Sequence, residues 1–149
     1  MASVCSECGA PISDGGSCRD NFHALLLLEA QVPGGPGELP HFYAVSCYAL
    51  QHPISFNYKA ETLHGLRQSL GEMLDGRISL DQLRRRTRRA ADGSTRILRR
   101  PDDPIPDWYS GAWPVHAGDV WAAGVDGYIA AVHRWAQSVR ETLSNWVIG

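Results

Sequence analysis

Three of the four cysteines of this 149-residue chain lie within its first eighteen residues, as Cys5, Cys8 and Cys18. A C-x-x-C turn brings two thiolates to one cation, and such a pair followed by further Cys or His is typical of a zinc site. Structural zinc takes four nitrogen or sulfur ligands, whereas catalytic zinc takes three and keeps one position open for water. The N-terminal cysteines therefore predict a zinc site that lacks one ligand.

The second of two predicted helices is expected to supply that ligand. The helices, over residues 18–31 and 41–51, are joined by a loop of about ten residues, and sequential helices of this kind commonly pack antiparallel. Cys18, where the first helix begins, then lies beside His52, where the second ends. We predict that Cys5, Cys8, Cys18 and His52 bind one zinc ion.

Cys47 and His41 are the rival fourth ligands. His41 lies roughly 16 Å along a straight helix from His52, at 1.5 Å per residue. Cys47 projects about 140° around the helix from His52, so both should not reach the same ion. A simpler interpretation is that Cys18 is a small buried apolar residue and that the C-x-x-C sequence binds no metal.

The same helix geometry places Glu29 opposite His41. Side chains at offsets of four, seven and eleven residues share a helix face, so Glu29 shares its face with Cys18, and His41 shares its face with His52. A carboxylate that faces an imidazole could act as an acid–base couple, which makes Glu29 and His41 the candidate catalytic residues. The alternative is a hydrogen bond that satisfies a half-buried histidine.

Capping signals predict where the helices begin. Ser17 is the expected N-cap of the first helix. Ser55 or Asn57 is expected to cap a third helix that runs to about residue 75. The sequence Ser79 to Gln82 forms a capping box for a fourth helix, which should end near residue 91.

The last predicted helix, over residues 125–146, has the clearest apolar face. Its apolar residues recur at spacings of three and four: Val125, Tyr128, Ile129, Val132, Trp135, Ala136, Val139, Leu143 and Trp146. With a short helix near residues 117–122, the elements sum to a mainly α fold, a small bundle of about five helices with little or no β structure. We expect one domain over residues 1–149, with a metal-binding knuckle at residues 1–17 and the helical bundle at residues 18–149.

Composition limits the classes of function. A net charge of −2 argues against the global basic field of a strong nucleic-acid binder. The longest apolar stretch falls far short of the roughly 20 residues of a membrane span, so we expect a cytoplasmic protein without membrane contact. In a reducing compartment, cysteines are better explained as metal ligands or free thiols than as disulfides.

Basic residues gather in one segment, which contains Arg84, Arg85, Arg88 and Arg89. These arginines are a possible contact to nucleic acid. However, they cannot all lie on one helical face, and acidic residues nearby favour a solvated helix with local ion pairs. Phosphate-binding glycine loops, the G-x-S-x-G elbow and the H-E-x-x-H pair are absent from the sequence.

The order and spacing of several short motifs resemble a bacterial family of uncharacterised small proteins, domain of unknown function 5946. The motifs include Cys5-x-x-Cys8-Gly9, Cys18, Gln51-His52-Pro53 and Trp113-Pro114, and the resemblance covers nearly the whole chain. It implies no established activity. It implies cysteine at the position of Cys18 and histidine at the positions of His41 and His52, with an acidic residue in some members at the position of Cys47.

We therefore predict a small helical protein that binds zinc for structural reasons and has a protein partner or a small molecule as its ligand. The first alternative is a zinc-dependent enzyme of hydrolase or lyase type, with an open metal position or a separate site at Glu29 and His41. The second is a regulator that contacts nucleic acid through the Arg84–Arg89 helix.

Overall fold

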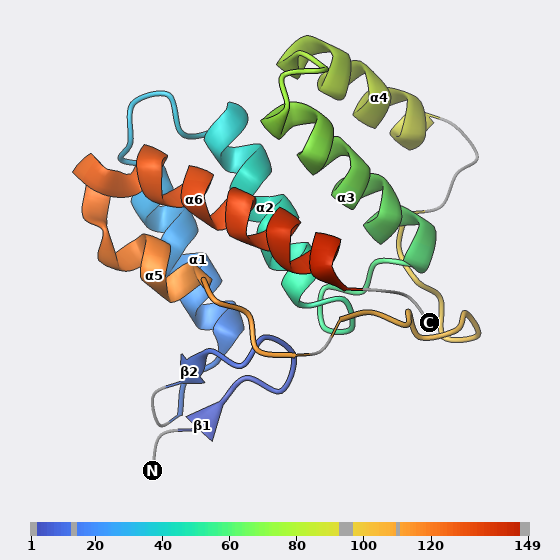
Figure 1. Cartoon of the computed structure of the whole chain (residues 1–149), viewed down its shortest axis with the longest axis horizontal. Coiled ribbons are helices and arrows are strands. Elements are labelled where there is room, and N and C mark those ends of the chain that lie inside the picture. Colours follow the sequence, from blue (N-terminus) through green and yellow to red (C-terminus); the bar gives the residue numbers. More distant parts are fainter. Residues whose placement is uncertain (1–2, 13–14, 93–96, 110, 147–149) are drawn as a thin grey trace.

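The computed structural model describes residues 3–12, 15–92, 97–109 and 111–146, without the side chains of residues 89–92. These residues form six helices and one small hairpin, so the fold is mainly α, as predicted (Figure 1). The helices are α1 (Cys18–Glu29), α2 (Leu39–Gln51), α3 (Ala60–Leu74), α4 (Leu80–Asp92), α5 (Ala117–Ala122) and α6 (Gly124–Asn145).

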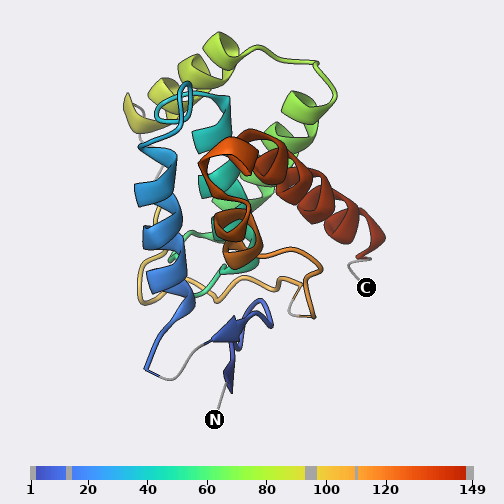
Figure 2. The same ribbon diagram turned by 90° about the vertical axis from the view of Figure 1, so that its left-hand side faces the viewer.

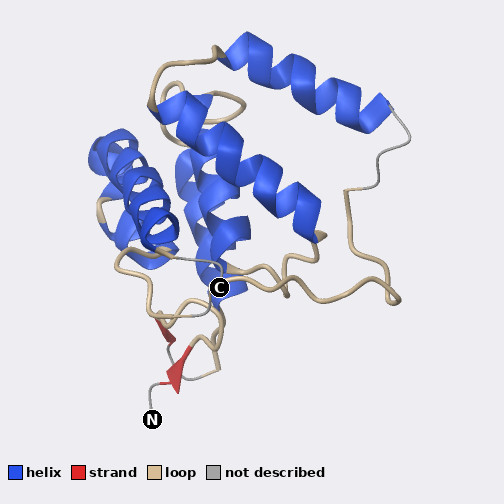
Figure 3. Cartoon of the chain, turned by 45° about the vertical axis from the view of Figure 1, so that its right-hand side comes forward, coloured by secondary structure: helices blue, strands red, loops and turns tan. Residues whose placement is uncertain are grey.

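The hairpin contains the N-terminal cysteine pair. Strands β1 (Ser3–Val4) and β2 (Pro11–Ile12) are antiparallel, with Ser3 opposite Ile12. Figure 3 shows the two strands at one end of the molecule, below the helices. Such a short hairpin is at best marginally stable alone, so its position depends on contacts with the helices.

Helix α6 lies in the middle of the bundle, across α2 and between α5 and α3 (Figure 1). Its buried side chains are Tyr128, Ala131, Val132, Trp135, Ala136, Val139 and Leu143. The predicted apolar face is therefore correct over most of its length, but Ile129 is wrong, because its side chain is 46% exposed.

Helices α1 and α2 run side by side in opposite directions (Figure 2). Glu29, at the end of α1, hydrogen-bonds His41 in the first turn of α2, and nearer the other end of the pair the rings of Phe22 and Tyr48 stack with centroids 4.1 Å apart. The backbone of α1 packs more closely on α5 than on α2. Large side chains therefore span the space between α1 and α2.

The structure confirms two predicted helix starts. Ser17 caps α1, where its hydroxyl accepts a hydrogen bond from the Asp20 N–H at 3.2 Å. Ser79 and Gln82 form the predicted reciprocal capping box before α4, with donor–acceptor distances of 2.7 and 3.1 Å. These bonds join residues three apart, so the local sequence is sufficient to specify them.

The predicted start of the third helix is wrong. Helix α3 begins at Ala60, and neither Ser55 nor Asn57 caps it. Asn57 instead has a φ of 66°, a left-handed conformation that Asn tolerates better than most residues. Its carbonyl accepts from the Arg99 N–H at 2.9 Å, and the next residue, Tyr58, forms a bridge with Leu98. Pairing with a distant segment has thus displaced the helix start.

No helix within the described ranges is long and apolar enough to cross a membrane. Helix α4 is the most polar of them and lies at one edge of the bundle (Figure 1). Leu83 is its buried side chain among those described. Arg84 donates to the Gly37 carbonyl at 2.7 Å, and Arg86 pairs with Glu72 at 3.1 Å, so arginines help to hold α4 in place.

Candidate metal centre

The structure brings together the four predicted metal ligands. One ligand atom from each of Cys5, Cys8, Cys18 and His52 lies within 4.8 Å of the others. The sulfur atoms of Cys8 and Cys18 are 3.5 Å apart, close to the separation of about 3.8 Å that Zn–S bonds of 2.3 Å give in a tetrahedron. All four cysteines of the chain are free thiols, so a disulfide does not account for this proximity.

The C-x-x-C segment forms a tight turn that directs two sulfurs to one side. Gly9 has a φ of 79°, a conformation that glycine adopts without steric cost, and its N–H donates to the Cys5 carbonyl at 2.9 Å. Backbone N–H groups of Cys8 and Glu7 hydrogen-bond the Cys5 sulfur, and that of Ala10 hydrogen-bonds the Cys8 sulfur. The turn is therefore built to hold negatively charged sulfur.

His52 presents a free ring nitrogen to this turn. Its Nδ1–H donates to the Tyr48 carbonyl at 2.8 Å, and a carbonyl oxygen can only accept, so the lone pair of the neutral ring resides on Nε2. Nε2 is buried and has no hydrogen-bond partner among the described residues. Metal-binding histidines characteristically donate their second ring N–H to a backbone carbonyl in this way.

Burial keeps His52 in the form that binds metal. It lowers the pKa of the imidazole, so the ring is neutral at physiological pH. The ring also stacks on Tyr48, with centroids 4.1 Å apart, which fixes its orientation. Its position at the end of α2, next to Pro53, follows from the restriction that proline places on the preceding residue.

Burial, with a smaller contribution from the neighbouring sulfurs, opposes ionisation of the Cys8 and Cys18 thiols when no cation is present. Burial raises the pKa of Cys8 to about 11, and burial and the neighbouring sulfurs raise the pKa of Cys18 still further. Burial also acts to raise the pKa of Cys5, but the hydrogen bonds from the N–H groups of Cys8 and Glu7, together with those from the Cys18 and Cys8 side chains, outweigh it and lower that pKa. A bound dication would remove most of this repulsion, so metal binding and thiol deprotonation are coupled.

Distant residues anchor the turn, and the sequence analysis did not identify them. The Glu7 carboxylate accepts the N–H groups of Ile54 and Ser55 at 2.9 and 3.3 Å and the Ser55 hydroxyl at 2.5 Å. The Cys8 carbonyl accepts from His116 Nε2–H at 3.1 Å and from the Trp113 N–H at 3.3 Å. His116 is 108 residues from Cys8 along the chain, and no local pattern signals such a contact.

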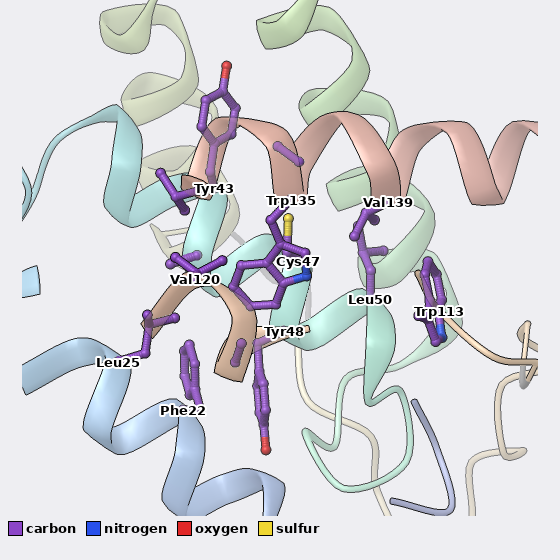
Figure 4. Close-up of a cluster of buried hydrophobic side chains, with 14 of the residues drawn as sticks. Phe22, Leu25, Tyr43, Cys47, Tyr48, Leu50, Trp113, Val120, Trp135 and Val139 are labelled. Atoms are coloured by element: carbon purple, nitrogen blue, oxygen red, sulfur yellow. The ribbon is translucent and has the colours of Figure 1, made fainter. Parts of the chain in front are cut away.

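A cleft of about 580 Å³ opens beside the four residues. Cys5, Cys18 and His52 contribute to its wall, and the remaining lining residues are Val4, Ser6, Glu7, Ile12, Ser17, Arg19, Phe22, His23, Tyr48, Ser55 and Phe56. Figure 4 shows the ring of Tyr48 beside that of Phe22, with its hydroxyl directed away from the apolar cluster. The hydroxyl of this largely buried residue makes no hydrogen bond with the described part of the chain, so it is free to contact a molecule in the cleft.

Cys47, one rival ligand, lies in the apolar core and is not part of this group. Its side chain is fully buried, and Figure 4 shows it beside Trp135. Burial raises its pKa well above the ordinary value for a thiol. Cys47 therefore contributes to packing, as its predicted position around the helix from His52 indicates.

His41, the other rival, forms a separate polar cluster at the far end of α1. Its Nδ1–H donates to Glu29 at 2.6 Å, and the Tyr128 hydroxyl donates to the second oxygen of the same carboxylate at 2.7 Å. Glu29 is 2% exposed, and a Cβ at Gly35 would lie 3.0 Å from its Cγ. The structure thus brings Glu29 and His41 together as predicted, but the third partner, Tyr128, was missed. Neither Glu29 nor His41 lines the cleft at the cysteines.

The arginines of α4 are partly engaged in local contacts. Arg84 contacts Gly37, Glu38 and Asp81, so local ion pairing is confirmed for that residue with Asp81 at 3.7 Å. Arg85 and Arg88 are exposed and form no ion pair with the residues that the structure describes. The side chain of Arg89 is outside the described part.

Comparison with known proteins gives one match. No curated protein and no solved structure matches this chain. A family of unknown function (DUF5946) matches residues 3–144, which include the four clustered residues, the cleft and every described helix except the last residue of α6. The chain therefore belongs to the DUF5946 family of unknown function.

Proposed function

We propose that this protein binds one structural zinc ion through Cys5, Cys8, Cys18 and His52 and uses the cleft beside it to bind a small molecule or a segment of a partner protein. Three sulfurs and one imidazole nitrogen form a donor set that suits tetrahedral zinc. Magnesium and calcium prefer oxygen ligands, so this set does not suit them. The ion would supply four bonds that join the N-terminal hairpin to the ends of α1 and α2.

The observation that carries this proposal is the state of His52. Leaving a buried ring nitrogen without a partner costs about 1–3 kcal/mol, so such atoms require an explanation. Here the orphaned Nε2 lies within 4.8 Å of three thiol sulfurs. A cation between them accounts for the nitrogen, for the three sulfurs and for the N–H groups that hydrogen-bond Cys5 and Cys8.

A structural role follows from the number of protein ligands. Four ligands complete the tetrahedron and leave no position for a water, which a hydrolytic zinc ion needs. The ligands lie on two segments that only the folded chain brings together, so the free energy of zinc binding becomes free energy of folding. Glu7 and His116 hold the same turn from its other sides.

The cleft supports a zinc-dependent hydrolase or lyase as the second candidate. Cys5, Cys18 and His52 all line it, so a substrate there would be next to the ion. This function requires that one of the four residues leave the metal and that water take its place. We propose a structural role for Glu29 and His41, because Tyr128 and His41 together occupy both oxygens of the carboxylate.

We do not extend the proposal to nucleic acid. Arg84 and Arg86 are engaged with Gly37, Glu38 and Glu72, which leaves Arg85 and Arg88 as the cations without an ion pair among the described side chains of α4. Two isolated charges give a weak and strongly salt-dependent attraction to phosphates.

Metal analysis of the purified protein tests the proposal. We expect one zinc per chain, and a Co²⁺-substituted protein should show sulfur-to-metal charge transfer together with the visible bands of a tetrahedral ion. Removal of zinc with a chelator should lower the melting temperature. Six-coordinate Co²⁺, or a protein whose stability is the same with and without zinc, would contradict a structural Cys₃His site.

A further inference from the structure

The cleft beside the metal centre offers hydrogen-bond donors but no free carboxylate among its described lining residues. Glu7 is the one acidic residue of that lining, and both of its oxygens are occupied. One oxygen accepts the N–H groups of Ile54 and Ser55, and the other accepts the Ser55 hydroxyl. A ligand that carries acceptor oxygens therefore suits the cleft better than one that carries donors.

Tyr48 supplies the first of these donors. Only 5% of its surface is exposed, and its ring stacks on Phe22 and on His52 with centroids 4.1 Å apart in each case. Its hydroxyl is directed away from the apolar cluster (Figure 4) and has no hydrogen-bond partner among the described residues, although the residue lines the cleft. Polar groups of buried residues normally have partners, so this hydroxyl marks the position of an acceptor atom in the cleft.

The first turn of α1 supplies further donors. A helix begins with four N–H groups that have no partner within it. Ser17 accepts those of Asp20 and Asn21, whereas the N–H groups of Cys18 and Arg19 make no hydrogen bond with the described part of the chain. Arg19 lines the cleft, is exposed and forms no ion pair with the described residues. Its guanidinium and the helix dipole both favour a negative charge at this end of α1.

The two sets of donors are neighbours. Cys18 and Phe22 are four residues apart and share a face of α1, and the Phe22 ring stacks on Tyr48. One charged group of a ligand can therefore contact the Tyr48 hydroxyl and the start of α1 together.

Apolar side chains form much of the remaining lining. Phe56 packs edge-on against Tyr48 with centroids 5.7 Å apart, and Val4 and Ile12 add aliphatic surface from the hairpin. Val4 is 66% exposed, so its side chain is available to a ligand. The cleft volume of about 580 Å³ is in the range of small-molecule sites. The lining thus suits a small apolar body next to a charged group.

We propose that the cleft binds a small carboxylate with an apolar body. The carboxylate accepts hydrogen bonds from the Tyr48 hydroxyl and from the first N–H groups of α1 and pairs with Arg19, while the apolar body lies on Phe22 and Phe56. This inference rests on the proposed function, because it specifies the ligand of the same cleft. The metal keeps its structural role, and the ligand forms no bond to it.

Phenylacetate is a probe of this class, because it joins a phenyl ring to one carboxylate. Phenylacetamide keeps the ring and the carbonyl oxygen but has no charge, and acetate keeps the charge but has no ring. Two-dimensional NMR titration of the zinc-loaded, full-length protein gives the Kd of each compound and the amides that it moves. We expect phenylacetate to bind at least about tenfold more tightly than either, because hydrogen bonds to a charged acceptor are the stronger ones and the ring adds apolar contact. The amide signals of Cys18 and Arg19 should shift.

Two variants test the named contacts. Tyr48→Phe keeps the ring and removes the hydroxyl, so the affinity for phenylacetate should fall about tenfold, as loss of a hydrogen bond to a charged group predicts. Arg19→Gln should weaken phenylacetate by about threefold, because an exposed ion pair is weak, and should leave phenylacetamide unchanged. Arg85→Gln is the matched control, an exposed arginine outside the cleft lining, and should bind like the unmodified protein. Zinc content of one per chain in each variant shows that the fold is intact.

The outcomes separate this inference from the proposed function. Metal analysis of the same samples decides the proposed function, which a chain without zinc refutes. A zinc-loaded chain that does not bind phenylacetate, or that binds phenylacetamide equally well, refutes this inference alone. Unchanged affinity in Tyr48→Phe would refute the contact with its hydroxyl. Equal losses in Arg19→Gln and Arg85→Gln would mean that net charge, rather than a contact in the cleft, attracts the carboxylate.

Discussion

Replacement of His52 by alanine separates its role as a metal ligand from its role in packing. The buried ring stacks on Tyr48, so His52→Ala should destabilise the protein even without metal. The informative quantity is therefore the difference between melting temperatures measured with zinc and with chelator, for each variant. The packing loss is present in both conditions and cancels in that difference.

The expected magnitude follows from linkage. Free zinc at a thousand times its dissociation constant stabilises the native chain by about 4.1 kcal/mol. Loss of an outer-shell partner already weakens metal binding by up to about 100-fold, and loss of a ligand should cost at least that, which is about 2.7 kcal/mol at the same zinc concentration. At about 2–4 °C per kcal/mol for a chain of this size, the zinc-dependent rise in melting temperature should fall by about 5–11 °C.

Differential scanning calorimetry at fixed free zinc, set with a metal buffer, measures this difference. His64→Ala is the matched control, because His64 is an exposed histidine that packs edge-on against Trp108 and lies outside the metal group. It should retain the full zinc-dependent shift. If His52→Ala also retained it, then Nε2 would not bind the metal, and the reasoning from its missing hydrogen bond would be wrong.

Three further substitutions test the core and the second polar cluster. Cys47→Ser should lower the free energy of unfolding, measured with urea, by about 1–3 kcal/mol, because it buries a hydroxyl in apolar surroundings. Zinc content should stay at one per chain. A loss of zinc would show that Cys47 is a ligand. Tyr128→Phe should lower the free energy of unfolding by about 1.5–3 kcal/mol, because it removes the hydrogen bond to the buried Glu29. The loss should be smaller in a Glu29→Gln background. Additive effects in this double-mutant cycle would show that the two residues are not coupled. Gly35→Ala should destabilise by about 1–3 kcal/mol, because its Cβ would lie 2.9 Å from the Glu29 carbonyl oxygen, and an unchanged urea midpoint would mean that the loop moves aside without cost.

Much of the candidate site could be predicted because its residues fall on regular helices. The offset between Cys18 and Glu29 equals that between His41 and His52, and helical periodicity then sets which side chains share a face. Antiparallel packing of consecutive helices was sufficient to place Glu29 beside His41 and Cys18 near His52. Ser17 and Ser79 could be recognised as caps because their hydrogen bonds reach only three residues along the chain.

The errors and omissions all involve distant segments. Asn57 is a residue type that often caps helices, but its carbonyl pairs with the Arg99 N–H and its backbone is left-handed, in a turn that precedes α3. Tyr128 reaches Glu29 across 99 residues, and His116 reaches Cys8 across 108. Tyr and His are common in many environments, so nothing in their local sequence identifies these partners.

The sequence by itself determined the donor atoms, the helices that carry them and the register in which two helix faces meet, since these depend on spacing within single elements. Only the tertiary structure decided that α5 packs on α1, that Glu7 and His116 hold the cysteine turn, and that a cleft opens beside the cysteines. Exposure and hydrogen bonding of a side chain depend on every segment that packs around it, and spacing along one helix carries no information about the others.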